Sequence, residues 1–562
     1  MGKIRTFVKA TADAVLKFWE EFQTSFGGKK TSIWIPETTD TDANAAIKPK
    51  GNGANLAQDP DGTTTGGNAR GEYATDWQKE RNANTQVASG NYSIISGGNF
   101  NTASGTNSIA IGTNNTASGN FAGTAIGRNN TASGSGATAI GTSNESSGTR
   151  SAIGGGFDNE ATAQHSTVGG GELNVASGDH STVSGGDNNT ASGSHATVSG
   201  GNNNTASNGH STISGGRNNT AIGVYATVGG GLGNVDVGNY STISGGNSNS
   251  ANIQYATIGG GQSNTASSDY STVSGGQNNT ASTDTHATVG GGQDNTASGQ
   301  RATIGGGESN TASNSYATVS GGFNNTASGE QSTVGGGDSN NALNAYSTIS
   351  GGNSNTAGGT RATVGGGRAN TASNSYATVS GGFTNTASGG FSTVSGGQRG
   401  KAYSYGQSSL ASGLFSTDGD AQVSQIISRR EADLTTGGTT TLHLDGSSIN
   451  FAFDTANKAA NILAEWIAVV DSISGTATGV NVGDVIAQDD LFLLKEVSGV
   501  MSIVGTVTNT ATKNDTSQAT ASMAYSTGGT DLDITFTGAT FSGGGTLTYR
   551  IVHRIIMVEV GF

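Results

Sequence analysis

The feature that most constrains this chain is a short sequence unit that recurs from about residue 95 to residue 394. Each unit carries Ser or Ala, then Thr, then Val or Ile, then two or three Gly or Ser, and closes on Asn-Thr-Ala-Ser-Gly or a close variant. The branched residue serves as the marker of each unit, and the markers are Ile95, Ile111, Ile126, Ile140, Ile153, Val168, Val183, Val198, Ile213, Val228, Ile243, Ile258, Val273, Val289, Ile304, Val319, Val334, Ile349, Val364, Val379 and Val394. Self-similarity at a fixed short period indicates stacked coils.

The unit is too short to hold a helix and a strand, and it is rich in Gly and β-branched Thr. Strand alternation would place Ala196 and Val198 on one face and Thr197 on the other. We therefore expect neighbouring coils to pair as parallel strands in an all-β, fibrous β-solenoid or β-roll, with a rise of about 4.8 Å per coil. A disordered Gly/Ser/Asn linker would not keep branched residues in register over so many units.

The apolar content of one coil is small, because it offers one branched residue and one or two Ala. Ordering a whole coil costs conformational entropy that so few buried side chains offset poorly. We therefore expect several chains to share one core along a common axis, as a homotrimer.

Composition narrows the possible functions. Hydrophobic residues are 32% of the 562 residues and Gly alone numbers 94, which argues against one large globular core. The net charge of −14 argues against nucleic-acid binding, which needs a basic footprint. The chain has no Cys, so it can form neither a disulfide nor a thiolate metal site, and we expect no cofactor.

Two stretches of the repeat resemble known families. The run Asn107–Gly112, followed by Asn115–Gly119 and Thr124–Gly127, resembles the head repeat of trimeric autotransporter adhesins. That resemblance implies a left-handed parallel β-roll and a homotrimer. The later coils, with Thr-Val-Ser-Gly-Gly in place of Ala-Ile-Gly, are similar to repeats of bacteriophage tail-fibre proteins. We expect this shaft to span residues 91–415, with residues 86–96 as its capping coil.

Residues 1–28 have a different character. Apolar residues recur at three- and four-residue steps, which predicts a short amphipathic α-helix that ends at Gly27–Gly28. Lys9, Asp13 and Lys17 interrupt any apolar run, which argues against a secretory signal. The helix is interpreted as a trimerising coiled coil, as a segment that docks into a virion, or, less favoured, as a membrane-surface helix. The docking residues would be Phe7, Val15, Phe18, Trp19 and Phe22.

Residues 29–90 contain all three Pro of the chain and are expected to form a linker or adaptor. The segment 69–78 within it resembles the entry into the roll of phage fibre proteins.

One variable column of the repeat lies three residues before each marker. It includes His165, His180, His195, His210, Tyr225, Tyr240, Tyr255 and Tyr270. Stacked coils would place these rings about 4.8 Å apart, so we expect a ladder. Mutual stacking is the favoured interpretation, and a glycan-contacting strip or metal capture by the four His are the alternatives. The Asn column, for example Asn189 and Asn204, is interpreted as an amide ladder, and an ice-binding Thr face is a remote alternative.

After residue 415 the repeat gives way to a neck, 416–430, and a C-terminal domain, 431–562. Strands are predicted at 439–444, 449–453, 462–470, 491–496, 501–508, 519–525, 532–537 and 547–560, which favours an antiparallel β-sandwich. The entry Gly419–Gln422 and the closing Val558–Val560 resemble the C-terminal domain of phage fibre and spike proteins. The sequence contains no recognisable catalytic motif, so we do not expect an enzyme.

These observations predict a virion fibre that attaches a phage particle to the host surface. The N-terminus would bind a tail or capsid protein, and the C-terminal tip would bind a host glycan or protein. The protein would lie on the virion, outside the cell. A cellular surface adhesin is the first alternative, and a polysaccharide-cleaving spike is the second.

Overall fold

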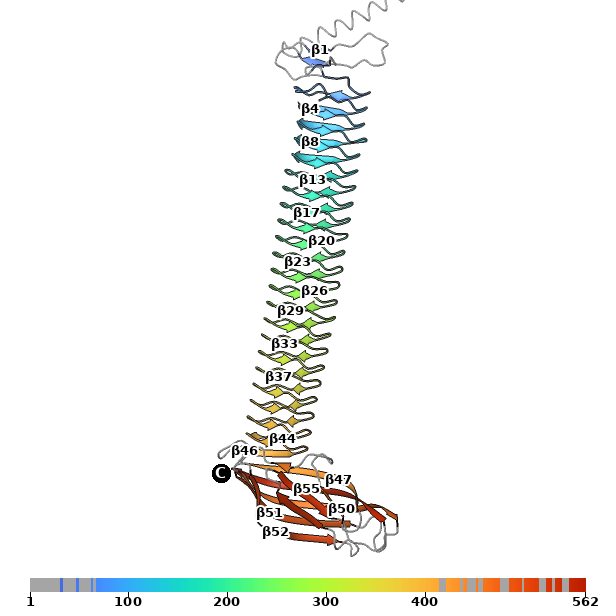
Figure 1. Cartoon of the computed structure of the whole chain (residues 1–562). Helices are drawn as coiled ribbons and strands as arrows, with labels where there is room; N and C mark the ends of the chain where they lie inside the picture. Colours follow the sequence, from blue (N-terminus) through green and yellow to red (C-terminus); the bar gives the residue numbers. More distant parts are fainter. Residues whose placement is uncertain are drawn as a thin grey trace, which may run out of the picture. The chain divides into compact units, whose positions relative to one another are not determined.

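The computed structural model describes residues 31–33, 47–49, 62–63, 67–413, 421–434, 438–441, 451–452, 458–475, 485–497, 500–514, 522–527, 531–537 and 545–561. The chain divides into two compact units, Met1–Gly261 and Gln262–Phe562. In each unit short strands stack coil upon coil (Figure 1), and together the described residues hold about 23 turns of parallel β-solenoid. Among the described residues every regular element is a strand, and none forms a helix long and apolar enough to cross a membrane. The predicted helix at 1–28 lies outside the described residues.

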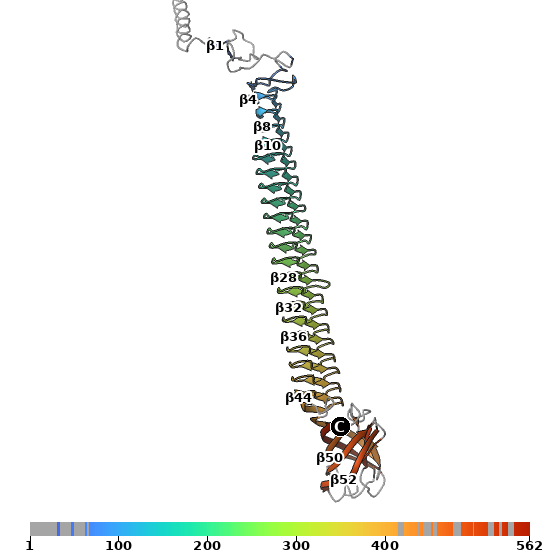
Figure 2. The ribbon, with the colours of Figure 1, turned by 90° about the vertical axis from the view of Figure 1, so that its left-hand side faces the viewer.

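Each coil contributes one strand to each of two sheets, which we call sheet B and sheet C (Figure 2). In the first unit, sheet B consists of β3 (Thr75–Asp76), β4 (Ile94–Asn99), β6 (Ile109–Thr113), β8 (Thr124–Arg128), β10 (Thr138–Thr142), β12 (Ala152–Ile153), β14 (Thr167–Val168), β16 (Thr182–Val183), β18 (Thr197–Val198), β20 (Thr212–Ile213), β22 (Thr227–Val228), β24 (Thr242–Ile243) and β26 (Thr257–Ile258). Sheet C consists of β5 (Thr102–Ala103), β7 (Thr116–Ala117), β9 (Thr131–Ala132), β11 (Glu145–Ser146), β13 (Glu160–Ala161), β15 (Val175–Ala176), β17 (Thr190–Ala191), β19 (Thr205–Ala206), β21 (Thr220–Ala221), β23 (Val235–Asp236) and β25 (Ser250–Ala251). A separate hairpin pairs β1 (Thr31–Ile33) with β2 (Ile47–Pro49).

The second unit continues the same two-sheet pattern. Its part of sheet B consists of β28 (Thr272–Val273), β30 (Thr288–Val289), β32 (Thr303–Ile304), β34 (Thr318–Val319), β36 (Thr333–Val334), β38 (Thr348–Ile349), β40 (Thr363–Val364), β42 (Thr378–Val379), β44 (Thr393–Gln398) and β46 (Ser408–Gly413). Its part of sheet C consists of β27 (Thr265–Ala266), β29 (Thr280–Ala281), β31 (Thr296–Ala297), β33 (Thr311–Ala312), β35 (Thr326–Ala327), β37 (Asn341–Ala342), β39 (Thr356–Ala357), β41 (Thr371–Ala372), β43 (Thr386–Ala387) and β45 (Lys401–Ala402).

Parallel pairing of neighbouring coils confirms the predicted solenoid. This pairing begins closer to the N-terminus than the capping coil expected at residues 86–96. Thr75 and Asp76 of β3 already pair in parallel with Ile94 and Ile95 of β4. Further along, equivalent residues of neighbouring coils face each other, as Val183 faces Val198.

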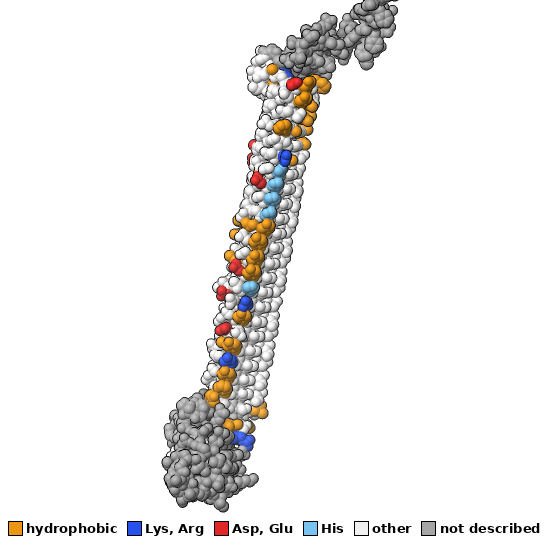
Figure 3. All heavy atoms as spheres, turned by 90° about the vertical axis from the view of Figure 1, so that its right-hand side faces the viewer, with side chains coloured by type: hydrophobic (Ala, Val, Ile, Leu, Met, Phe, Trp, Pro, Cys, Tyr) orange, Lys and Arg blue, Asp and Glu red, His pale blue; other side chains and the backbone are white. Residues whose placement is uncertain are grey.

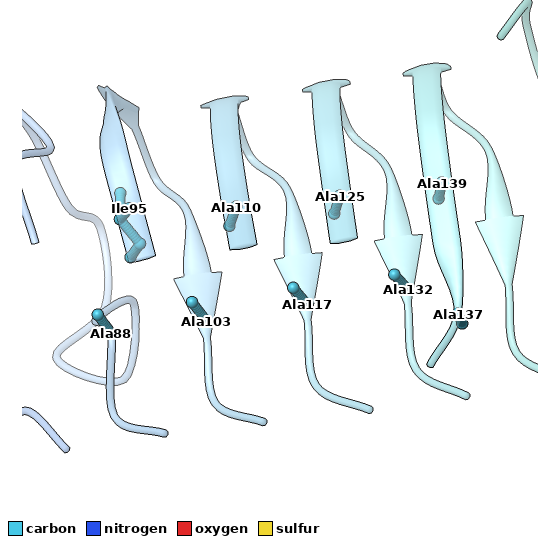
Figure 4. Close-up of a cluster of buried hydrophobic side chains, with 9 residues drawn as sticks. All are labelled: Ala88, Ile95, Ala103, Ala110, Ala117, Ala125, Ala132, Ala137 and Ala139. Atoms are coloured by element: carbon cyan, nitrogen blue, oxygen red, sulfur yellow. The ribbon is translucent and has the colours of Figure 1, made fainter. Parts of the chain in front are cut away.

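The core of each coil lies between sheets B and C of the same chain. Val198, Ala206 and the neighbouring marker Ile213 are fully buried within a single chain. Figure 4 shows the same arrangement in the first coils, where Ala103, Ala117 and Ala132 of sheet C lie in one row. The physical argument for a core shared between chains is therefore wrong, because the paired sheets come close enough for Ala and one branched residue to fill the space. The homotrimer itself stays a prediction.

Three of the sequence markers are misplaced by one residue. Ile95 pairs with Ala110, and Ala139 pairs with Ile153, so the inward column in the intervening coils is alanine. Ala110, Ala125 and Ala139 are fully buried (Figure 4), whereas Ile111, Ile126 and Ile140 lie half-buried on the outer face. Since side chains alternate along a strand, a shift of one residue turns the whole set outward.

The C-terminal strands of the second unit form two antiparallel sheets. The larger sheet contains β47 (Ala421–Leu434), β55 (Gly545–Gly561), β50 (Lys458–Gly475), β51 (Val485–Val497) and β52 (Val500–Asn514), and the smaller contains β48 (Thr439–Thr441), β54 (Asp531–Thr537), β49 (Phe451–Ala452) and β53 (Ser522–Thr527). Each of the eight predicted strands overlaps one of these. β47 also pairs antiparallel with β46, so the larger C-terminal sheet is hydrogen-bonded directly to the last strand of the solenoid.

The two C-terminal sheets contact each other through aromatic side chains. The rings of Phe536 and Tyr549 meet edge to face with centroids 5.2 Å apart. The Tyr525 hydroxyl lies 3.1 Å from Nε2 of the buried His553. A closed sandwich stays a prediction.

Candidate functional site

The column that precedes each marker forms a surface ladder, which we call the ring ladder. In the first unit it contains His165, His180, His195, His210, Tyr225, Tyr240 and Tyr255, all at a turn with φ of 55° to 60°. In the second unit it contains Tyr270, His286, Arg301, Tyr316, Gln331, Tyr346, Arg361, Tyr376 and Phe391. Figure 3 shows the His, Tyr and Arg side chains as a line on one face of each unit.

The rings of the first unit stack face to face from His180 to Tyr255, whereas the His165 ring is tilted by 34° against His180. The centroids of His180 and His195 lie 4.8 Å apart at an interplanar angle of 6°. His210 and Tyr225 lie 4.6 Å apart at 1°, and Tyr225 and Tyr240 lie 5.1 Å apart at 13°. Adjacent rings therefore cover each other's faces.

In the second unit the stacking continues at Arg361, where an arginine takes the place of an aromatic residue. The Arg361 guanidinium lies 4.9 Å from the Tyr346 ring centroid and 5.3 Å from that of Tyr376. Tyr376 then stacks on Phe391 with centroids 4.5 Å apart. A planar cation thus takes the place of a ring between two aromatic faces.

The backbone conformation at these positions does not explain why they carry aromatic side chains. A positive φ favours Gly, Asn and Asp, and other residues adopt it at some cost. The second left-handed column of the coil consists mostly of small polar residues, for example Asn188, Asn203 and Asn218 at φ of 55° to 57°. The ring ladder occupies the same kind of backbone position with bulky rings, so the stacking contributes what the backbone preference does not.

This geometry bears on what the ladder can bind. A sugar packs on the face of an aromatic ring, but in the stacked pairs of the ladder one ring face lies against the face of its neighbour. The four consecutive His rings stack in a row rather than converging on one point. Among the described residues no group of three or more His, Cys, Asp or Glu is arranged to hold a metal ion.

The Asn column forms a buried amide ladder inside the solenoid. The Asn204 backbone amide and its Nδ2 both donate to Oδ1 of Asn189, at 3.0 and 3.1 Å. The same Nδ2 lies 3.0 Å from the Gly200 carbonyl and 2.9 Å from the Gly216 carbonyl. A Cβ at Gly201 would come within 2.1 Å of that Gly216 oxygen, which explains the glycine there. The column is therefore structural.

A polar network that the repeat did not reveal closes the N-terminal end of the solenoid. The Gln78 side chain accepts the Asn101 backbone amide at 2.8 Å, as an Asn side chain does in later coils. Next to it Asp76 is buried between Arg81 Nη2, at 2.8 Å, and Arg70 Nε, at 3.0 Å. The sequence signal for this cap is a Gln that precedes the first Asn of the ladder, with an acidic residue and two Arg close by.

The other end of the solenoid carries an uncharged cap. Gln422 of β47 accepts the Lys401 backbone amide at 2.7 Å and donates to the Lys401 carbonyl at 2.8 Å. Ser424 and Gln407 hydrogen-bond beside it at 2.9 Å. Both ends of the core are thus covered by side-chain amides, as the end coils of a repeat protein require polar caps.

In the buried column of sheet C that is otherwise mostly Ala, one position holds a carboxyl group. Asp236 is fully buried and accepts from the Ser241 hydroxyl and, at 3.2 Å, from the Thr227 backbone amide. Burial raises the pKa of this carboxyl to about 7. Ser146 stands in the same column and bonds Ser151 at 2.6 Å, so polar residues are accepted there when a Ser lies opposite.

The expected docking residues Phe7, Val15, Phe18, Trp19 and Phe22 lie outside the described residues, so their assignment stays a prediction.

Of the comparisons with known proteins, the family-model match bears on the repeat itself. The model of the ubiquitous surface protein adhesin repeat matches residues 181–193 and 317–329, which lie within the coils. No curated protein matches the chain. Among solved structures, the tailspike protein of Acinetobacter phage vB_ApiP_P1 is 9% identical with a TM-score of 0.21, covering 73% of this chain and 82% of that one. The tailspike protein of Acinetobacter baumannii phage AM24 is 10% identical with a TM-score of 0.16, covering 84% and 78%.

Proposed function

We propose that this protein is an attachment fibre on a phage particle, in which the solenoid is a stiff shaft and the C-terminal sheets are the host-binding tip. The single observation that carries this proposal is the coil repeat within each unit, whose interior is filled by packed apolar side chains and by the hydrogen-bonded Asn column. Stacked coils of this kind are suited to a shaft. The adhesin-repeat match within the coils supports an extracellular, surface-attachment role.

Three further parts belong to the proposal. The N-terminal segment joins the particle, three copies associate into one fibre, and the tip contacts a host glycan or protein. Three weak tip sites on each fibre would act together, because linked sites raise avidity without stronger single contacts. The direct pairing of β46 with β47 supports this division of labour, since it couples the tip to the shaft through backbone hydrogen bonds.

A cellular surface adhesin is the second candidate, and the adhesin-repeat match is the observation that favours it. The two candidates differ in where the protein is found. Antibody labelling of purified particles would decorate the particle under the fibre proposal and leave it bare under the adhesin alternative.

The attachment function is tested with the full-length protein. Purified protein should compete with particles for adsorption to host cells. Fab fragments against residues 421–561 should block adsorption, whereas Fab fragments against residues 167–258 should not. Adsorption that is blocked only by the shaft-directed Fab would contradict the assignment of the tip. Release of oligosaccharides from host polysaccharide by the purified protein would favour the polysaccharide-cleaving alternative.

A further inference from the structure

The turn that leads into the ring ladder commonly begins with Gly, but one coil of the first unit begins it with Asn208. Gly193 and Gly223 hold the equivalent position in the coils on either side. The Ser211 backbone amide and hydroxyl both donate to the Asn208 carbonyl, at 3.1 and 2.7 Å, and close the turn. Asn208 is exposed. The coil therefore presents a carboxamide to solvent where its neighbours have no side chain.

The Asn208 side chain lies over the backbone that follows it. The Gly209 backbone amide donates to Oδ1 of Asn208 at 2.9 Å. Short polar side chains commonly bond the backbone next to them in this way. Because Oδ1 is bonded to Cγ, the Gly209 nitrogen lies beside the carbonyl carbon of the side chain. A nucleophile and an electrophile are thus held close together within one turn.

Two coils of the second unit have Asn at the same position and show what is different at Asn208. The Ser315 backbone amide donates to Oδ1 of Asn314 at 2.8 Å, while Asn314 Nδ2 donates to the Ser328 carbonyl of the following coil at 3.0 Å. Asn374 makes the equivalent pair of bonds, at 2.8 and 3.0 Å. In the described coils Asn208 Nδ2 makes no such bond, so its carboxamide can rotate to present Cγ to the nitrogen.

The residue that follows also differs, because Asn208 precedes Gly209, whereas Asn314 precedes Ser. Glycine has no Cβ to shield its nitrogen. The coil itself does not need a glycine here, since Gly209 does not adopt a positive φ and a Cβ on it would meet only the Ser194 carbonyl oxygen, at 3.9 Å. Asn-Gly occurs in the chain only at 52–53 and 208–209, and the first pair lies outside the described residues.

We propose that Asn208 is a site of spontaneous covalent modification, in which it deamidates through a cyclic imide. Asn is a thermolabile residue in proteins. The Gly209 nitrogen forms a bond to Cγ of Asn208, the bond from Cγ to Nδ2 breaks, and Nδ2 leaves as ammonia with the proton of the Gly209 amide. Water then opens the imide at either carbonyl and yields aspartate or isoaspartate. The reaction consumes only water.

The isoaspartate product alters the turn. The chain then runs through Cγ, so the backbone gains a methylene group, and a free carboxylate replaces the carbonyl that accepts the two Ser211 bonds. Both products add a negative charge beside His210 of the ring ladder. The modification therefore marks and loosens one coil, and it does not depend on the attachment function.

Peptide mapping of the full-length protein tests the proposal and includes its own comparison. Trypsin cuts after Arg, so Asn208 lies on the peptide 151–217 and Asn314 on the peptide 302–361. After incubation in warm neutral buffer, fragmentation mass spectrometry should show NH2 replaced by OH at Asn208, with isoaspartate among the products. Asn314 should remain largely intact. An Asn208 that is converted no more than Asn314 would overturn the proposal.

Two variants separate the chemistry from the fold. Gly209→Ser reproduces the Asn-Ser pair of the second unit, and the converted fraction at Asn208 should fall to that of Asn314. Asn208→Gly restores the residue of the neighbouring coils and removes the reactive side chain. Hydrogen exchange at the Ser211 amide should become faster on incubation of the natural sequence and stay unchanged in Asn208→Gly. Circular dichroism establishes that both variants are folded. A folded Gly209→Ser variant that converts as fast as the natural sequence would contradict the mechanism.

Discussion

The side chain of Asn204 accepts the backbone amide of Asn219 at 3.0 Å, while its own Nδ2 reaches Oδ1 of Asn189 in the preceding coil at 3.1 Å. One buried amide thus joins three successive coils. Hydrogen-bonding groups that lose their partner inside a protein destabilise it, by about 1–3 kcal/mol each.

Substitution in the Asn ladder should therefore lower the free energy of unfolding more than substitution at an exposed position. Asn204→Ala leaves the Gly200 and Gly216 carbonyls and the Asn219 amide without this partner, and it should lower the free energy of unfolding by roughly 3 kcal/mol or more. Denaturant unfolding followed by circular dichroism measures the change. The control is Asn278→Gly, which removes an exposed Asn at a φ of 54° that Gly adopts without strain, and it should change stability by well under about 1 kcal/mol. Equal effects of the two variants would contradict a structural ladder.

Asp236 should make the first unit less stable as the pH rises. Its carboxyl has a folded-state pKa of about 7, raised from 3.8 by burial, so the folded state holds the proton more tightly than the unfolded state. The contribution is fully present below pH 3.8 and is lost as the pH rises through 7, by up to about 1.4 kcal/mol per pH unit.

Asp236→Ala tests this dependence, because Ala is the usual residue of that column. Unfolding midpoints measured from about pH 4 to pH 8 should fall for the natural sequence relative to the variant. Parallel pH profiles would show that Asp236 does not titrate in this way.

His553 should make the second unit less stable as the pH falls, the opposite of the effect of Asp236. Burial lowers the pKa of this imidazole from 6.5 to about 3, so the unfolded state takes up the proton first on acidification. The contribution of His553 is present above pH 6.5 and is lost as the pH falls towards 3. His553→Gln should flatten the acid limb of the unfolding profile of the C-terminal sheets. An unchanged acid limb would contradict the assignment.

The N-terminal cap should protect the first coils from fraying. Asp76→Asn leaves the buried Arg81 guanidinium without its carboxylate, and breaking a buried ion pair in this way costs about 3–5 kcal/mol. Hydrogen exchange across residues 71–103 should become faster. Lys79→Ala removes an exposed charge two residues from Arg81 and should leave the exchange unchanged.

The ring ladder should contribute stability and not recognition. Tyr240→Asn removes two stacking contacts, worth about 0.5–1.5 kcal/mol each, while keeping a residue that tolerates a positive φ. A modest loss of stability with unchanged adsorption is expected. Loss of adsorption by the folded variant would transfer recognition from the tip to the ladder.

The sequence predicted the coil because its period is strict, and it predicted the eight C-terminal strands because turn residues separate them. It misplaced Ile111, Ile126 and Ile140 because hydrophobicity selects Ile over Ala, whereas the parallel register turns Ala110, Ala125 and Ala139 inward. The shared core was expected because only apolar side chains were counted. The sequence correctly indicated that Asn189 and its equivalents form an amide ladder, but the hydrogen bonds with which they stabilise each coil were not counted in the argument for a shared core.

Electron cryo-microscopy of the purified fibre at side-chain resolution tests the central claim most directly. The account predicts that every chain encloses its own core, with Ala110 and Val198 inside their coils and Ile126 on the outer face. Marker residues of different chains interleaved in one common core, or helices in place of the stacked coils, would contradict it.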